Sequence, residues 1–218
     1  MAITSGDITN FAQIMIWVVN IIYFTALIPQ IWLNYKLRST NGLSDYMILG
    51  YMAGYIAQMY YNFCLDLPSG YKVIVPFALF GVLIMTFQRI YYHKHKGSSD
   101  LFFLSATIAC WVISILAIPF AFKYPKETGY VCGWITTCIW STYQIPQAVK
   151  IYKNKSVTGL SLPFTLLLGL GILTETISGF ILNLPMPTIF NNLRSITSYI
   201  IFLAIYFYYR NYDLKKRN

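Results

Sequence analysis

Seven long runs of this sequence contain almost no charged residues. Uncharged stretches cover residues 8–35, 46–65, 73–88, 101–122, 128–149 and 156–174, and the last run, 176–209, is interrupted only by Arg194. A helix needs about 20 apolar residues to cross the hydrocarbon core of a bilayer. Only 11% of the residues are charged and 57% are hydrophobic, whereas soluble domains carry about 25% charged residues. The pattern predicts an integral membrane protein and excludes both a soluble globular domain and a disordered chain.

The spacing of these runs predicts seven transmembrane helices and an all-α fold. The helices are expected near residues 11–33, 44–65, 71–92, 101–122, 128–150, 161–182 and 188–209. The third run is short, but Lys72 and Arg89 flank it and can extend their aliphatic stems toward the membrane interface. The lipid bilayer is therefore the first partner expected for this chain.

Lysine and arginine are distributed unequally between the two ends of the predicted helices. The loops after helices one, three and five and the C-terminal tail hold twelve of them, whereas the opposite side holds only Lys72, Lys123 and Lys126. Cytoplasmic loops carry the excess of basic residues in membrane proteins. Residues 1–10 are thus expected outside the cell or in a lumen, and the basic tail, 211–218, in the cytosol. The net charge of +9 reflects this orientation, so no nucleic-acid partner is predicted.

The sequence also contains an internal repeat with an offset of 117 residues. The aligned segments are Ile28-Pro29-Gln30 with Ile145-Pro146-Gln147, Gly42-Leu43-Ser44 with Gly159-Leu160-Ser161, and Leu67-Pro68 with Leu184-Pro185. We therefore divide the chain into a first three-helix repeat (11–96), a linker with helix four (97–127) and a second three-helix repeat (128–210). A single linker helix makes the two repeats parallel, related by an axis along the membrane normal, with a cavity between them.

Each repeat carries a Pro-Gln pair near the cytosolic third of its first helix. A proline removes a backbone donor and clashes with the preceding turn, which kinks a helix. In lipid the freed carbonyl needs another partner, and the amide of Gln30 or Gln147 is expected to supply it. Because the pair recurs in register, Pro29 and Pro146 are interpreted as hinges, with an ordinary static kink as the alternative.

The two motifs resemble the two signatures of the PQ-loop repeat family. The matching residues are Pro29-Gln30, Asn34-Tyr35-Lys36, Arg38-Ser39 and Gly42-Leu43-Ser44 in the first repeat, and Pro146-Gln147, Tyr152-Lys153, Lys155-Ser156 and Gly159-Leu160-Ser161 in the second. The resemblance covers nearly the whole chain and implies the seven-helix, three-one-three layout of that family. The family includes cystinosin-like proteins and lysosomal cationic amino-acid exporters, and it is related to the MtN3/SWEET sugar transporters.

This resemblance implies a membrane transporter rather than an enzyme. The implied substrate is a small polar solute, in the first place an amino acid of the cystine or cationic type, moved by alternating access and coupled to protons. Two alternatives stay open, a SWEET-like sugar uniporter and a cargo receptor resembling the KDEL receptor. The implied membrane is bacterial cytoplasmic or, in a eukaryote, lysosomal or vacuolar. No large luminal domain precedes the first span, which favours a minimal or bacterial relative, and a homo-oligomer is compatible with this plan.

Two charged residues inside the predicted spans are candidates for the functional site. Glu175 lies in helix six, where a carboxylate is costly unless it faces the bundle interior or is protonated. It is interpreted as a proton-coupling residue or a ligand of a substrate amine, with a structural hydrogen-bonding role as the alternative. Arg194 in helix seven is expected either to pair with Glu175 or to bind a substrate carboxylate.

Amide side chains complete the candidate substrate site. Asn191 and Asn192 come shortly before Arg194, in the part of helix seven where the resemblance to the sugar transporters implies a functional asparagine. Gln58 is the repeat counterpart of Glu175, and Asn62 resembles a cystinosin-like position at the end of helix two.

Tyrosines form a further group of candidates. Tyr143 is the first of them, and Tyr23, Tyr55 and Tyr61 are also considered as cavity residues, against the alternative of ordinary core or lipid contacts. The sequence contains no catalytic motif and no metal-ligand spacing. No cofactor is therefore predicted, and the coupling ion implied by the resemblance is H⁺.

The predicted orientation can be tested at residue 97, in the loop between helices three and four. A Gly97→Cys variant should react with a membrane-impermeant thiol reagent only from the cytosolic side, because this loop belongs to the basic set. Labelling of that cysteine in intact cells would overturn the orientation.

Overall fold

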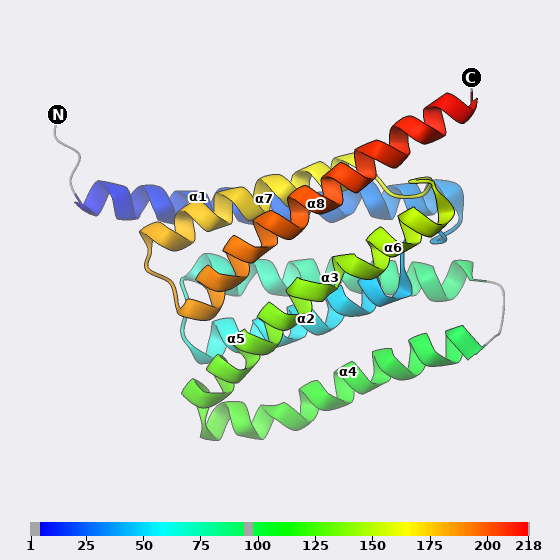
Figure 1. Cartoon of the computed structure of the whole chain (residues 1–218). Coiled ribbons are helices and arrows are strands. Elements are labelled where there is room, and N and C mark those ends of the chain that lie inside the picture. The colour runs from blue at the N-terminus through cyan, green and yellow to red at the C-terminus, as the bar shows by residue number, and fades with distance from the viewer. Residues whose placement is uncertain (1–4, 94–97, 218) are drawn as a thin grey trace.

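The protein, described by a computed structural model for residues 5–93 and 98–217, is built from helices with short connections (Figure 1). The helices are α1 (Ser5–Leu37), α2 (Asp45–Cys64), α3 (Ser69–Tyr92), α4 (Ser98–Lys123), α5 (Pro125–Thr142), α6 (Gln144–Asn154), α7 (Leu162–Ile181) and α8 (Met186–Arg217). The all-α prediction is confirmed, and most helix bounds lie within a few residues of the expected ones. The 96/97 boundary and position 97 lie outside the described residues, and the predicted tail is largely a continuation of α8.

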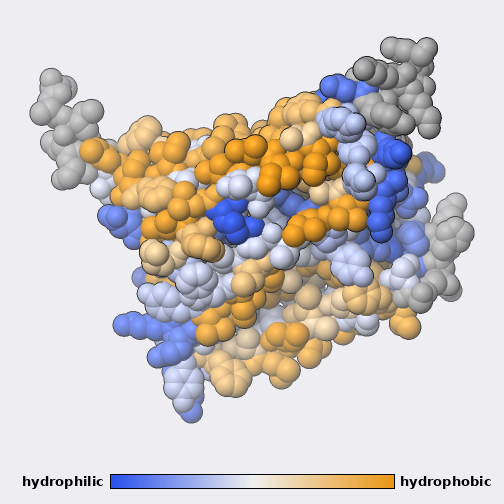
Figure 2. Space-filling model, in the orientation of Figure 1, coloured by the Kyte–Doolittle hydropathy of each residue, from blue (hydrophilic) through white to orange (hydrophobic). Residues whose placement is uncertain are grey.

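The helices run side by side and alternate in direction, except that α6 continues α5, so α1 begins and α8 ends at opposite ends of the bundle (Figure 1). We call the end with the α1–α2, α3–α4 and α6–α7 loops the C-terminal face, and the other end the N-terminal face. Within the described residues, five helices are long and apolar enough to span a membrane by length and composition, namely α1, α3, α4, α7 and α8. Hydrophobic residues dominate the middle of the surface, while hydrophilic residues gather mainly toward its ends (Figure 2). The chain is thus an integral membrane protein.

The fifth predicted span is not one continuous helix. It consists of α5 and α6, which are separated at Tyr143. The proline at position 146 lacks the N–H that would bond the carbonyl of Thr142, and its ring crowds that carbonyl. The helical hydrogen bonding is therefore interrupted after Thr142, although the backbone of Tyr143 is itself helical (φ −61°, ψ −27°). In contrast, α1 continues through Pro29 to Leu37. The helix is interrupted at only one of the two prolines, and the hinge role of Pro29 and Pro146 stays a prediction.

The two repeats interlock rather than lying as separate bundles. The first helix of each repeat packs along the second helix of the other, α1 along α7 and α2 along α5. The linker α4 lies at the edge of the bundle against α2 and α5 (Figure 1). This arrangement places the contact between the repeats, and not the linker, at the centre of the molecule.

Backbone geometry repeats together with the sequence. Four non-glycine residues of the described chain have a positive φ: Arg38 (45°), Asp66 (51°), Lys155 (49°) and Asn183 (49°). They form two pairs offset by the repeat length, Arg38 with Lys155 and Asp66 with Asn183. Each follows or nearly follows the end of a helix, where a left-handed residue lets the chain reverse. The internal repeat is therefore also a repeat of backbone conformation.

The break in the fifth span can be removed by one substitution. Pro146→Ala should join α5 and α6, because alanine restores the missing N–H and relieves a clash that costs about 3 kcal/mol in a helix interior. Hydrogen–deuterium exchange should then slow at residues 143–147. Pro29→Ala is the matched comparison and should change exchange much less, since α1 is already continuous. Equal effects of both variants would contradict this assignment.

Candidate functional site

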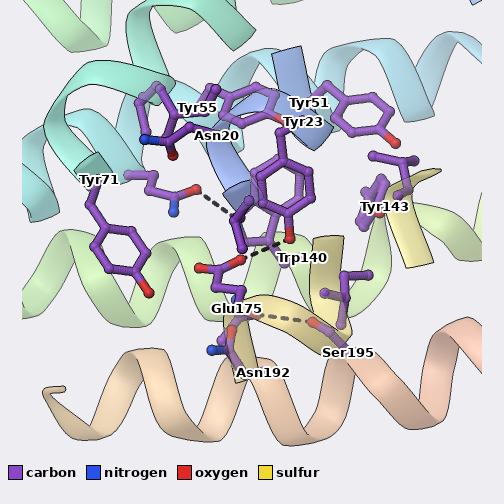
Figure 3. Close-up of a pocket in the computed structure, with 17 residues that line it drawn as sticks. Asn20, Tyr23, Tyr51, Tyr55, Tyr71, Trp140, Tyr143, Glu175, Asn192 and Ser195 are labelled. Carbon is purple, nitrogen blue, oxygen red and sulfur yellow. Dashed lines mark hydrogen bonds between the residues drawn. The ribbon is translucent and has the colours of Figure 1, made fainter. Parts of the chain in front are cut away.

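A cavity of about 70 Å³ lies between the two repeats. Residues from α1, α2, α3, α5, α7 and α8 line it, together with Tyr143 at the α5–α6 break, and none of them comes from α4. The lining residues are Val19, Asn20, Tyr23, Tyr51, Tyr55, Gln58, Tyr71, Ile74, Val75, Trp140, Tyr143, Leu168, Ile172, Glu175, Asn191, Asn192 and Ser195 (Figure 3). The volume suits a few water molecules or part of a small solute.

Glu175 is the only formally charged residue among those that line this cavity. Its side chain is 9% exposed, and its Oε2 accepts a hydrogen bond of 2.8 Å from the hydroxyl of Tyr23 on α1 (Figure 3). The carboxylate thus faces the interior of the bundle, which is the condition for tolerating a charge at membrane depth.

A second hydrogen bond across the cavity is the repeat counterpart of the first. The indole Nε1 of Trp140 on α5 donates to Oε1 of Gln58 on α2 at 3.3 Å (Figure 3). Trp140 occupies the position of Tyr23 in the second repeat, and Gln58 the position of Glu175 in the first. Each repeat therefore contributes one aromatic donor and one polar acceptor to the cavity.

Several buried polar atoms around the cavity have no hydrogen-bond partner within the described chain. They include Oδ1 of Asn20 and Nδ2 of Asn192. Buried polar groups in folded proteins almost always have a partner, from the protein or from ordered water. A donor and an acceptor left open around one cavity fit water or a polar solute.

Arg194 does not enter this cavity. Its Nη1 donates to Oγ of Ser198 on the same helix at 3.1 Å, and its Nε and Nη2 have no partner among the described residues. Its electrostatic neighbours are Tyr143 and Cys138 rather than Glu175. The ion pair with Glu175 that the sequence allowed is therefore wrong, because the glutamate is turned toward Tyr23.

The remaining candidates divide between this cavity and a smaller pocket beside it. Gln58, Tyr143, Asn191 and Asn192 line the cavity, as do Tyr23 and Tyr55. Asn62 and Tyr61 lie instead in the pocket of about 10 Å³, which shares Gln58, Tyr71, Glu175 and Asn191 with the cavity. Their roles in binding stay predictions.

The smaller pocket marks the N-terminal side of the cavity. There the hydroxyls of Tyr61 and Thr188 are hydrogen-bonded at 2.6 Å, which joins the two repeats. Nδ2 of Asn62 donates to the carbonyl of Tyr71 at 2.7 Å and so fixes the connection between α2 and α3. Polar residues therefore extend from the cavity toward the N-terminal face.

The glutamines of the Pro-Gln pairs reach across to the other repeat at the C-terminal face. Gln30 donates through Nε2 to the carbonyl of Gly159 at 2.9 Å and accepts through Oε1 from the N–H of Ser161 at 2.8 Å. Both Gln30 and Asn34, to which Nε2 also donates, are completely buried.

The second glutamine repeats this contact in the opposite direction. Gln147 donates to the carbonyl of Gly42 at 2.9 Å and accepts from the N–H of Ser44 at 2.6 Å. We call the two contacts the glutamine clamps. The expectation that each glutamine satisfies a carbonyl of its own kinked helix is therefore wrong, because the backbone groups of the other repeat's loop are nearer partners in the folded bundle.

Two glycines allow the clamped loops to touch. A Cβ atom on Gly42 would lie 2.3 Å from the carbonyl carbon of Gly159, and one on Gly159 would lie 2.8 Å from Cα of Gly42. Gly159 also has a φ of +87°, which side-chain-bearing residues rarely adopt. The two loops therefore meet backbone against backbone at the C-terminal face.

Sequence reasoning missed Asn20, Tyr51, Tyr71, Trp140 and Ser195 as cavity residues. Two signals point to some of them. Asn20 is an isolated amide inside an apolar helix, and Trp140 is the repeat counterpart of a tyrosine that was considered. Tyr51, Tyr71 and Ser195 carry no such signal, since tyrosine and serine are common in the spans of this chain.

The glutamine clamps can be tested one at a time. Gln147→Leu keeps the size of the side chain but leaves the carbonyl of Gly42 and the N–H of Ser44 without partners, at about 1–3 kcal/mol for each. Amide exchange in residues 42–48 should rise about tenfold or more. Gln144→Leu is the matched control, because Gln144 donates to the Tyr143 hydroxyl and not to this loop. The same rise in both variants would contradict a clamp.

Comparisons with known proteins agree with this layout. The family model for the PQ loop repeat matches residues 4–71 and 128–188, together more than half of the chain. Cystinosin of Drosophila melanogaster is 24% identical over 175 residues, covering 67% of this chain and 42% of that protein. An uncharacterized protein of Schizosaccharomyces pombe is 30% identical over 146 residues, covering 63% of this chain and 51% of that protein. The chain thus spans about half the length of these relatives.

The fold also has a counterpart among solved structures. A eukaryotic SWEET transporter superposes with a TM-score of 0.67 at 14% sequence identity, covering 95% of this chain and 99% of that one. The likeness establishes the seven-span, two-repeat fold. Together with the match of the family model to both repeats, it places the chain in the PQ-loop repeat family.

Proposed function

We propose that this chain is a proton-coupled membrane transporter of a small polar solute, an amino acid of the cystine or cationic type. One observation carries the proposal. A cavity with a single carboxylate, several amides and several aromatic rings lies between two interlocked repeats, which the glutamine clamps join at the C-terminal face. The family membership and the relatives named above support a transport role.

The cavity offers complementary groups for both ends of an amino acid. The carboxylate of Glu175 suits a protonated amine, which also gains from the faces of aromatic rings such as Trp140 and Tyr55. The free Nδ2 of Asn192 is a donor for a carboxylate or hydroxyl group. This combination favours a zwitterionic or cationic solute.

Proton coupling is assigned to Glu175. A charged carboxylate is costly in the membrane interior, and a protonated one is much less so. Proton binding and release at this residue would thus accompany each crossing. In the proposed cycle the C-terminal face, oriented to the cytosol by its excess of lysine and arginine, opens when the clamps on Gly42 and Gly159 separate.

Sugar transport is the second candidate. The superposition on a SWEET transporter and the aromatic residues beside Asn191 and Asn192 favour it, since rings and amides also suit sugars. A receptor that captures a peptide carboxylate receives less support, because Arg194 is not among the cavity residues.

Uptake into proteoliposomes tests these candidates directly. The purified full chain should accumulate a labelled amino acid from a panel that includes cystine, lysine and arginine, and accumulation should require an inward proton gradient. Glucose and sucrose are measured beside them. Uptake of a sugar alone, without any effect of the gradient, would replace the proposed function by the second candidate.

Glu175→Gln separates coupling from binding. Glutamine imitates the protonated carboxyl in shape and keeps an acceptor for Tyr23. The variant should lose accumulation driven by the proton gradient, down to the level without a gradient. Exchange of substrate at equal pH should continue, but with a higher KM, because the amine loses its charged ligand. Because Arg194 is not its partner, folded yield should stay near wild type. Normal gradient-driven uptake by Glu175→Gln would rule out the coupling role.

A further inference from the structure

We propose that Tyr23 is the positioning residue for the coupling carboxylate, holding the ionised form of Glu175 by a hydrogen bond that joins the two repeats. The inference rests on the proposed function for its role in transport. The hydrogen bond itself runs from α1 in the first repeat to α7 in the second, at 2.8 Å. The phenol can donate to either oxygen of the ionised carboxylate, and this charge-assisted bond is stronger than the one it makes to a protonated carboxyl.

The ring of Tyr23 is held in place by a glycine. A Cβ atom on Gly171 would lie 2.3 Å from Cε1 of the tyrosine, so the ring rests directly on the backbone of α7. Gly171 lies four residues before Glu175, on the same face of the helix. Gly171, which contacts the ring of Tyr23, and Glu175, which accepts its hydrogen bond, therefore lie on one face of α7. This arrangement points the hydroxyl toward the carboxylate.

The same arrangement of a glycine, an aromatic donor and a polar acceptor occurs a second time, with different residues: Gly54, Trp140 and Gln58. A Cβ atom on Gly54 would lie 2.8 Å from the ring of Trp140, and Trp140 donates to Gln58, four residues further along α2. Gly54 and Gly171 are counterparts in the repeat. Because both repeats contain a glycine under an aromatic donor and an acceptor four residues further along, the arrangement is a feature of the fold. Only the copy with Glu175 contains a group that can bind and release a proton at ordinary pH.

Among the residues that line the two pockets, no lysine, arginine or histidine offers Glu175 a positively charged partner in place of Tyr23. The titratable groups that face Glu175 are tyrosines, from α1, α2, α3 and the α5–α6 break, and α8 contributes only amides and hydroxyls. They are Tyr23, Tyr51, Tyr55, Tyr61, Tyr71 and Tyr143, with Asn191, Asn192, Thr188 and Ser195 on α8. Of these, the hydroxyl of Tyr23 bonds the carboxylate in the structure.

The bond links protonation to the contact between the repeats. When a proton from solution binds a carboxylate oxygen of Glu175, the charge-assisted bond becomes a weaker neutral one. Tyr23 keeps its own proton throughout. Proton binding thus weakens one of the contacts between α1 and α7, two helices that must separate in part if the repeats move against each other.

Infrared titration of the full chain in lipid nanodiscs tests this inference without any substrate. The difference between wild type and Glu175→Gln isolates the carboxyl band of Glu175, and its intensity against pH gives a midpoint. Tyr23→Phe keeps the ring on Gly171 but removes the donor, so the midpoint should rise by about one pH unit. Tyr55→Phe is the matched control, which removes a hydroxyl from the same cavity and should leave the midpoint in place.

A third variant distinguishes loss of the hydrogen-bond donor from a general disturbance of the cavity. Tyr23→Trp restores an N–H donor of the kind that the second repeat uses, and its midpoint should fall between those of wild type and Tyr23→Phe. An unchanged midpoint in Tyr23→Phe, an equal rise in Tyr55→Phe, or the absence of a titrating Glu175 band would overturn the inference. A clear rise in a protein that transports none of the panel would overturn the proposed function and leave the positioning role standing.

Discussion

The two repeats of this protein are joined by reciprocal polar contacts at a place where apolar contacts contribute little. Lipid tails are as apolar as leucine, so helices in a bilayer gain little from burying leucine against leucine. The amides of Gln30 and Gln147 instead bind backbone groups of the opposite repeat, and such bonds are costly to leave unmade in a low dielectric. Because each loop is completed by the other repeat, neither three-helix unit is closed on its own.

A shared backbone with divergent side chains gives the bundle its asymmetry. In the first repeat Asn34 donates to Gln88, which donates in turn to the carbonyl of Ile31. The counterparts of Asn34 and Gln88 in the second repeat are Ile151 and Ile205. The second repeat therefore has two apolar side chains where the first has hydrogen-bonded amides. The same divergence sets Glu175 opposite Gln58. A symmetric frame thus offers two equivalent positions in the cavity, and the sequence places an ionisable group in only one.

The spans, the repeat and the family were predictable because they depend on local properties: the length of apolar runs, the position of charges and motif spacing. The partners of polar side chains were not predictable in this way. Gln30 has a plausible acceptor in its own helix, but the packing of α1 along α7 brings the backbone of Gly159 and Ser161 within reach. The same packing turns Glu175 toward Tyr23 instead of Arg194. Such choices depend on which helices are neighbours, and no local pattern encodes that.

A charged residue in the membrane is affected by movement of the two repeats only if its hydrogen-bond partner lies in the other repeat. The bond from Arg194 to Ser198 lies within α8, so a rigid displacement of that helix leaves it unchanged. The bond from Tyr23 to Glu175 joins helices of different repeats, and any relative movement of the repeats must alter its length or break it. Under the proposed function, a proton on Glu175 and the arrangement of the two halves influence each other, because both act on the same hydrogen bond. Arg194 carries the more permanent charge, but its partner makes it insensitive to that movement.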